Sequence, residues 1–227
     1  RGVQREKERE RETESVCAVT KMGQHVQDLQ ELERQLPLEE TQPFTVLEEE
    51  TVYKRYITVT QREIRYPDGR CVSYDVTGKG GNFNIVFPFH SQSKTVTLIH
   101  EYCQGPNRMM FSLPGGAFSP DKHDSLQQSA EMELSEEAAL RGGEWVPLSQ
   151  AGFSFNKSTV DKFFPFLCID PVKDEEPHPQ DAEEHIWVVQ HVPVPDLKRI
   201  IREGRMMSVA TTASFLALDL LQERGLL

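Results

Sequence analysis

Basic residues, aromatic residues and long apolar runs are all scarce in this sequence of 227 residues. Lys and Arg number 25 against 36 Asp and Glu, and the net charge of −11 disfavours broad electrostatic capture of nucleic acid or of an anionic membrane surface. A basic groove of local extent is still compatible with that total. No apolar run approaches the roughly 18 residues that a membrane-spanning helix needs, so we expect no membrane partner.

Cysteine is scarce as well, and its spacing argues against two kinds of site. Cys17, Cys71, Cys103 and Cys168 lie far apart, without the paired spacing of a zinc site or of a disulfide framework. We therefore expect reduced thiols and an intracellular protein. The chain is long enough for one mid-sized domain with appendages, and a second large domain is not expected.

Three segments of different composition follow one another along the chain. Residues 1–14 carry five basic and five acidic side chains and almost no apolar ones, so we expect a charged mobile arm over residues 1–24. A tail that contacts RNA or a partner is the alternative for this arm. Apolar residues at near-helical spacing predict an amphipathic helix and linker over residues 25–43. Residues 44–227 are predicted to form the folded domain.

Alternating apolar and polar residues predict strands from about Phe44 onward. Within them, Tyr66-Pro67-Asp68-Gly69 predicts a hairpin turn, because Pro presets φ and Gly supplies a positive φ. Further strands are predicted at NFNIVFPF, KTVTLIHEY, WVPL, FFPFLCID and HIWVVQHVPV. Their regular alternation predicts that the large aromatic residues belong to the strand core rather than to a base-stacking surface: Phe83, Phe87, Phe89, Tyr102 and Trp187.

Three helices are predicted between and after these strands. The first runs from about Ser125 to Leu140, with Asp124 or Ser125 as its N-cap and Gly142 as its C-cap. The other two end the chain, at Val194–Glu203 and Ser208–Arg224. Strands interleaved with helices indicate an α/β sandwich.

The first helix groups three carboxylates on one face. Glu133, Glu136 and Glu137 stand at positions i, i+3 and i+4, so their side chains project toward a common point. Like charges at this spacing destabilise a bare helix by about 0.2–0.5 kcal/mol per pair. A hard divalent cation would make the grouping favourable, because Mg²⁺ and Mn²⁺ prefer carboxylate and carbonyl oxygens. A solvated acidic surface is the alternative interpretation.

The order of strand, glycine turn, loop and glutamate helix in FSLPGGAFSPDKHDSLQQSAEMELSEEAAL resembles the box motif of the Nudix hydrolase superfamily. TVYKRYITVTQREIRYPDGRCVSYDV, TLIHEYCQGPNRMMFSLPGG and EGRMMSVATTASFLAL are similar to segments of its ADP-sugar diphosphatase branch. The likeness spans residues from about 44 to 224. It implies a Nudix fold, in which a mixed β-sheet is sandwiched between α-helices, and divalent-metal-dependent pyrophosphohydrolase activity.

The resemblance also implies roles for residues at matching positions. Glu133, Glu137 and the backbone carbonyl of Gly115 would bind Mg²⁺ or Mn²⁺. Glu136 would be a further contact to the metal or to the attacking water. A bound metal would neutralise phosphate oxygens and lower the pKa of that water.

A catalytic base and substrate contacts are implied as well. Members of this branch often place the base on a later loop, and Asp161 matches that position, with Glu183 or Glu184 as the alternative. Gly115 and Gly116 would let the backbone approach the substrate. Arg108 is a candidate for contacting phosphate, and an exposed loop arginine without such a role is the alternative.

Several positions depart from the family pattern. Met132 stands in place of the box arginine, Asp124 in place of its first glutamate, and Ala139 in place of its last glycine, and the loop SPDKH contains an insertion. These changes affect the support of the site rather than the metal ligands. We therefore expect metal binding with slow turnover or an unusual substrate, since a misplacement of about 1 Å can lower a rate by about 10². Decay of catalysis with the fold retained as a scaffold is the rival explanation.

The resemblance leaves several substrates open. A general likeness to kinetoplastid mitochondrial Nudix factors of mRNA stability implies removal of pyrophosphate from the 5′ end of mitochondrial mRNA, with protein partners supplying RNA specificity. An acidic protein can act on such an end if it contacts only the terminal phosphates and base. An ADP-sugar diphosphatase and a non-catalytic Nudix-fold subunit that binds nucleotides or RNA ends are the alternatives. The branch also implies a possible homodimer, and the location would be mitochondrial or otherwise cytoplasmic.

Overall fold

The structure, a computed structural model of the chain, describes residues 44–180 and 185–227. The predicted charged arm, the predicted amphipathic helix, and the candidate bases Glu183 and Glu184 lie outside these residues. The predicted start of the folded domain at residue 44 therefore stays a prediction.

A three-stranded sheet opens the described chain, in the order β1-β2-β3. Its strands are β1 (Thr45–Lys54), β2 (Thr58–Arg65) and β3 (Cys71–Thr77). The turn between β2 and β3 is the predicted one: the Gly69 N–H donates to the Tyr66 carbonyl oxygen at 2.9 Å, and Gly69 has φ +87°. By their contacts, residues 44–46 and 64–72 form one compact unit, while residues 47–63 and 73–227 form a second, larger unit.

The larger unit contains a mixed sheet of seven strands, in the order β12-β5-β4-β10-β8, with β6 paired to β5 and β9 paired to β10. β4 and β10 are parallel, whereas the other pairs are antiparallel. The strands are β4 (Asn82–His90), β5 (Thr95–Cys103), β6 (Arg108–Ser112), β8 (Glu144–Pro147), β9 (Phe153–Ser154), β10 (Lys162–Ile169) and β12 (Ile186–Pro193). A separate two-stranded sheet pairs β7 (Leu140–Arg141) with β11 (Val172–Lys173).

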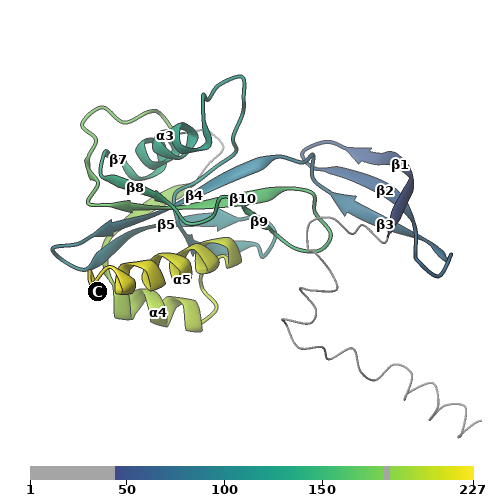
Figure 1. The fold of residues 1–227 in the computed structure, drawn as a ribbon. Coiled ribbons are helices and arrows are strands. Elements are labelled where there is room, and N and C mark those ends of the chain that lie inside the picture. The colour runs from purple at the N-terminus through teal and green to yellow at the C-terminus, as the bar shows by residue number, and fades with distance from the viewer. Residues whose placement is uncertain (1–43, 181–184) are drawn as a thin grey trace, which may run out of the picture. The chain divides into compact units, whose positions relative to one another are not determined.

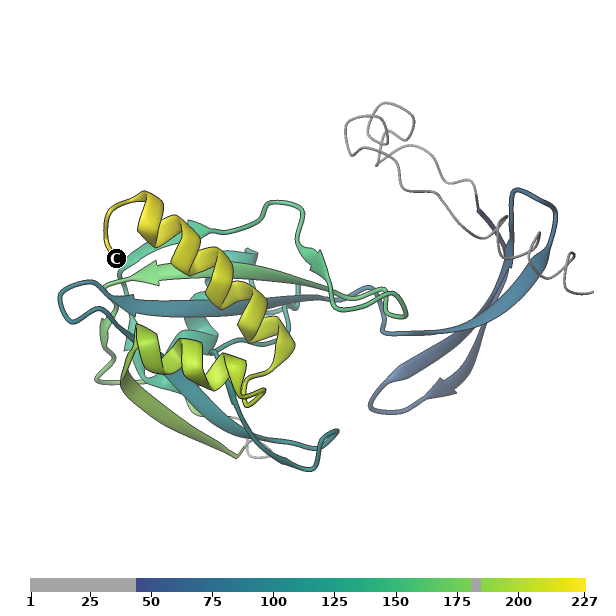
Figure 2. The same ribbon diagram turned by 90° about the horizontal axis from the view of Figure 1, so that it is seen from below.

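Helices cover both faces of the mixed sheet (Figure 1). α3 (Leu126–Ala138) packs on one face, where its buried side chains meet those of β4 and β10. α4 (Val194–Arg202) and α5 (Ser208–Glu223) lie on the other face, over the larger core (Figure 2). The predicted α/β sandwich is confirmed, and the three predicted helices are present with boundaries that differ by at most two residues.

Two sequence predictions about these elements are wrong. Gly142 does not cap α3, because Ala139 already turns into the left-handed region at φ +51° and its N–H donates to the carbonyl oxygens of Leu134 and Ser135. Tyr102 and Trp187 are not core residues, since they are 46% and 52% exposed. Alternation alone does not distinguish such exposed strand positions from buried ones.

The cap of α3 gives a stability prediction. A non-glycine residue in the left-handed region is strained because its Cβ crowds the following carbonyl oxygen. Ala139→Gly should therefore raise the free energy of unfolding by about 0.5–1 kcal/mol, measured by urea denaturation. Ala138→Gly, one residue earlier and inside the helix, should instead lower it, because glycine is a poor helix former. Equal effects at the two positions would contradict the cap assignment.

Candidate functional site

The glycine turn after β6 runs beside β4 and completes the sheet there. The Asn84 N–H donates to the Gly116 carbonyl oxygen at 2.9 Å, and the Val86 N–H donates to the Pro114 carbonyl oxygen at 2.8 Å. Consecutive peptide groups of an extended segment point in alternate directions, so the polar groups of Gly115 face away from β4. The Gly115 N–H accordingly donates to the Glu137 carboxylate, Oε2, at 2.7 Å.

Close contacts surround both glycines of the turn. A Cβ at Gly115 would overlap the carbonyl oxygen of Asn84 and would lie 2.8 Å from the Cα of Ile85. A Cβ at Gly116 would overlap the carboxylate of Glu133. The turn is thus wedged between β4 and the glutamate helix. Only glycine fits at position 115, because the contacts there are with backbone atoms, whereas the contact at position 116 is with the flexible end of a side chain.

The helix that carries the carboxylates is fixed at its start and along its buried face. The Ser125 hydroxyl oxygen accepts a hydrogen bond from the Gln128 N–H at 3.1 Å, as an N-cap does. Ala130, Leu134 and Ala138 are fully buried against the sheet, which sets the rotation of the helix. In this rotation, Glu133 and Glu137 face the glycine turn.

The three predicted carboxylates occupy different environments. Glu137 is only 4% exposed and bonds the backbone of Gly115, while Glu133 lies against Gly116. Glu136 is half-buried on the same helix. Across residues 44–180 and 185–227, no group of three or more His, Cys, Asp or Glu side chains is arranged to hold a metal ion. The turn therefore brings two of the three carboxylates to one place, and the metal assignment stays a prediction.

Local hydrogen bonds support the loop where the family pattern is broken. In the inserted segment, the Ser119 N–H donates to Nδ1 of His123 at 3.1 Å, and the His123 N–H donates to the Ser119 carbonyl oxygen at 2.9 Å. The Gln128 side chain accepts the Asp124 N–H at the start of the helix. These contacts stabilise the junction of loop and helix. They involve residues other than the arginine and glutamate of the box motif that the sequence resembles.

Asp161 is placed across β4 from the glycine turn. Its Oδ1 accepts the N–H groups of Lys79 and Gly81 at 3.0 and 2.8 Å. The following residue, Lys162, pairs with Asn82 on the edge of β4 that faces β10, whereas the turn bonds the opposite edge. The backbone at Asp161 and the backbone of the glycine turn are therefore separated by about two strand spacings of ~4.8 Å. The carboxylate holds a glycine-rich loop, and its role as a base stays a prediction.

Arg108 is not brought beside the turn either. It opens β6, and the seven residues to Gly115 correspond to about 20 Å of extended chain. Its guanidinium donates to the Gly204 carbonyl oxygen at 3.2 Å, just after α4. This contact ties β6 to the segment before α5, and a phosphate contact by Arg108 stays a prediction.

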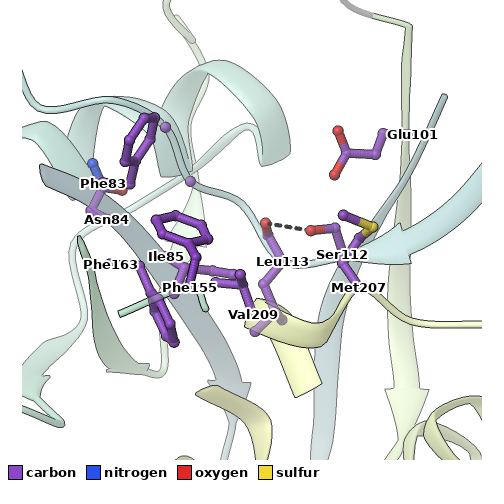
Figure 3. A pocket seen from close by; sticks show the side chains of 12 residues that line it. Phe83, Asn84, Ile85, Glu101, Ser112, Leu113, Phe155, Phe163, Met207 and Val209 are labelled. Carbon is purple, nitrogen blue, oxygen red and sulfur yellow. Dashed lines mark hydrogen bonds between the residues drawn. The ribbon is translucent and has the colours of Figure 1, made fainter. Parts of the chain in front are cut away.

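A pocket of about 140 Å³ opens beside the glycine turn (Figure 3). Gly115 and Gly116 form part of its wall, together with residues from β4, β5, β6, β10 and the start of α5. The other lining residues are Phe83, Asn84, Ile85, Glu101, Ser112, Leu113, Phe155, Phe163, Met207 and Val209. The wall is mostly apolar, with a few polar groups, as is usual for a site that binds a small organic molecule.

Two polar residues in this wall were not singled out by sequence reasoning. Burial raises the pKa of the Glu101 carboxyl, although a hydrogen bond from Ser112 acts in the opposite direction. Asn84 is buried and donates through Nδ2 to the Ser129 hydroxyl at 2.9 Å, but its Oδ1 finds no partner among the described residues. An unmade buried hydrogen bond costs about 1–3 kcal/mol, which a bound water or ligand would offset. The signal in the sequence was a polar residue inside each apolar strand, FNIVF and TLIHEY.

Comparisons with known proteins test the fold. No family model and no curated protein matches the chain. A crystal structure of an ADP compounds hydrolase superposes with a TM-score of 0.71 at 21% sequence identity, over 83% of this chain and 100% of that one. Identity at this level establishes the fold and leaves the activity of this chain open. The chain has a mixed α/β fold that matches the structure of this ADP compounds hydrolase.

Proposed function

We propose that this protein is a divalent-metal-dependent pyrophosphohydrolase that cleaves between two phosphates of a nucleotide-bearing substrate. The observation that carries the proposal is the hydrogen bond from the Gly115 N–H to the buried Glu137 carboxylate, with Glu133 packed against the adjacent Gly116. A glycine turn that positions two carboxylates is the arrangement that the family resemblance implies. The structural likeness to an ADP compounds hydrolase supports the same reaction class.

The donor atoms at the turn suit a hard cation. Glu133 and Glu137 offer carboxylate oxygens, and the alternation of the backbone directs the Gly115 carbonyl to the same side as its N–H. Mg²⁺ commonly takes only one or two carboxylates and completes its shell with water and substrate phosphate, so two glutamates are sufficient. When bound, the metal would neutralise phosphate oxygens and lower the pKa of an attacking water.

The chain's own residues would position the reacting groups. Gly115 fixes the orientation of Glu137 through its N–H, and the buried helix face holds that carboxylate in place. We assign proton acceptance from the attacking water to Glu136, because it is half-buried on the same turn of α3 as Glu137. Asp161 is less suited, because its Oδ1 already accepts two backbone N–H groups.

The finer proposal concerns the substrate. We infer that the protein acts on the 5′-phosphorylated end of an RNA in a complex with partner proteins, in the mitochondrion. The acidic charge of the chain supports contacts limited to an end rather than to a long phosphate backbone. Within the described residues, no helix is long and apolar enough to cross a membrane.

Metal-dependent product release tests the reaction. The full chain would be incubated with ADP-ribose, GTP and 5′-triphosphorylated RNA, with Mg²⁺ or with EDTA, and the products separated by chromatography. We expect cleavage between phosphates in Mg²⁺ and none in EDTA, with the RNA end as the best substrate. Release that does not depend on metal would contradict the proposal.

A non-catalytic nucleotide-binding subunit is the other class of function compatible with this site. Met132 and Ala139, which replace supporting residues of the family motif, favour it. Tight binding of a triphosphorylated end without turnover of any substrate would establish this alternative. Preference for ADP-ribose over the RNA end would instead identify an ADP-sugar diphosphatase.

A further inference from the structure

We propose that the pocket beside the glycine turn receives the nucleobase of the substrate, and that Glu101 selects guanine there. The inference rests on the proposed function for the identity of the ligand class. It adds a specificity site made of residues outside the glutamate helix: the ring of Phe155 and the carboxylate of Glu101.

The size and lining of the pocket suit one flat ring system. An apolar cavity of about 150 Å³ is known to hold a benzene molecule, so the volume of about 140 Å³ has room for a flat ring that enters the pocket and none for a whole nucleotide. Three phenylalanines form one side of it. Phe155 meets Phe83 and Phe163 edge to face, with ring centroids 5.5 and 5.3 Å apart. Phe155 remains 37% exposed, so part of its ring can stack on a base.

Glu101 lies across the pocket from these rings (Figure 3). It stands on β5, and Ser112 and Met207 lie near it on the same side of the pocket. A carboxylate only accepts hydrogen bonds, so it favours a base edge with two adjacent N–H donors. Guanine offers N1–H beside its amino group. Adenine instead carries the acceptor N1 beside its amino group. The lone pair of N1 would repel a carboxylate oxygen.

The burial of Glu101 strengthens this selection. Loss of water raises the pKa of its carboxyl, which means that the ionised form lacks the hydration it would have at the surface. Donors from a base would replace that hydration, whereas a base without paired donors would leave the charge poorly solvated. Discrimination therefore comes from the penalty on the wrong base as much as from contacts to the right one.

The position of the pocket relates it to the carboxylates. Gly115 and Gly116 line the pocket, and the same two residues contact Glu137 and Glu133. A nucleotide whose base enters the pocket would thus carry its phosphates to the glycine turn. The backbone of Gly115 and Gly116 would then lie next to both the base and the phosphates.

Binding of nucleoside monophosphates in EDTA tests the pocket, because these compounds have no pyrophosphate bond to cleave. At pH 7.5, calorimetry should show that GMP binds at least about tenfold more tightly than AMP, CMP or UMP. Phe155→Ala should weaken GMP binding about tenfold or more, since stacking of a base on an aromatic ring accounts for a difference of that order. Phe155→Tyr, which keeps a ring, should bind GMP within about threefold of wild type.

Glu101→Gln should bring GMP and AMP to within about threefold of each other, because an amide donates as well as accepts. Phe215→Ala is the matched control: Phe215 is 54% exposed on α5 and does not line the pocket, so GMP binding should be unchanged. Full GMP affinity in Phe155→Ala, or an unaltered guanine preference in Glu101→Gln, would overturn the proposal. A chain that binds GMP as described yet hydrolyses nothing would refute the proposed function and still support the pocket.

Discussion

Replacing Glu137 by Gln should lower metal-dependent hydrolysis by about 100-fold or more. The Gln side chain keeps an oxygen that can accept the Gly115 N–H, so the turn is retained while the negative charge offered to a metal is lost. A metal contributes several kcal/mol of charge stabilisation in the transition state, and each 1.36 kcal/mol corresponds to about tenfold in rate. Steady-state kinetics with saturating Mg²⁺ would measure the effect.

Glu131→Gln is the matched control for this substitution. Glu131 lies on the same helix but is exposed, where it accepts a hydrogen bond from Gln127 at 2.9 Å. Its rate should stay within about twofold of wild type, because surface substitutions of this kind have small effects. Equal rates in wild type, Glu131→Gln and Glu137→Gln would contradict a role of the glutamate helix in hydrolysis.

The second large effect is expected from a single methyl group at the glycine turn. In Gly115→Ala, the new Cβ would overlap the carbonyl oxygen of Asn84, which is backbone and cannot swing aside. We expect a loss of about 3 kcal/mol in the free energy of unfolding, at the upper end for overpacking. Any folded fraction should also lose most of its hydrolysis, because a shift of about 1 Å at a site can cost about 10² in rate.

Gly105→Ala provides the comparison for urea denaturation. No described atom lies within 4 Å of a Cβ at Gly105, and its φ is not in the left-handed region. Its free energy of unfolding should change by less than about 1 kcal/mol, and the sign should favour alanine. If Gly115→Ala were as stable as Gly105→Ala, the turn would not be wedged between β4 and the helix.

The elements of this fold were predictable where local signals agreed. The Pro67-Asp68-Gly69 turn, the apolar runs of β4 and β10, and the Ser125 cap each combine a propensity with a pattern, and the structure confirms them. The end of α3 was not predictable in this way. Gly142 looked like the natural cap, but Ala139 adopts the required positive φ because β7 begins at the next residue.

The site was only partly predictable, because contacts across the sheet depend on strand order. The spacing of Glu133 and Glu137 sufficed to place them on one helix face, and the structure adds their contacts with the glycine turn. Asp161 matched the position of the base in the family resemblance, yet β4 lies between it and the turn. Glu101 and Phe155 meet in one pocket although 54 residues separate them in the sequence.

Direct observation of a metal at the glycine turn would test the central claim most sharply. Crystals of the full chain would be soaked with Mn²⁺ and a non-hydrolysable guanosine polyphosphate, and anomalous scattering would locate the metal. We predict an ion bound by a carboxylate oxygen of Glu133 or Glu137 and by a phosphate oxygen of the nucleotide, at roughly 2.0–2.3 Å. Clear nucleotide density without an anomalous peak beside those two carboxylates would contradict the account.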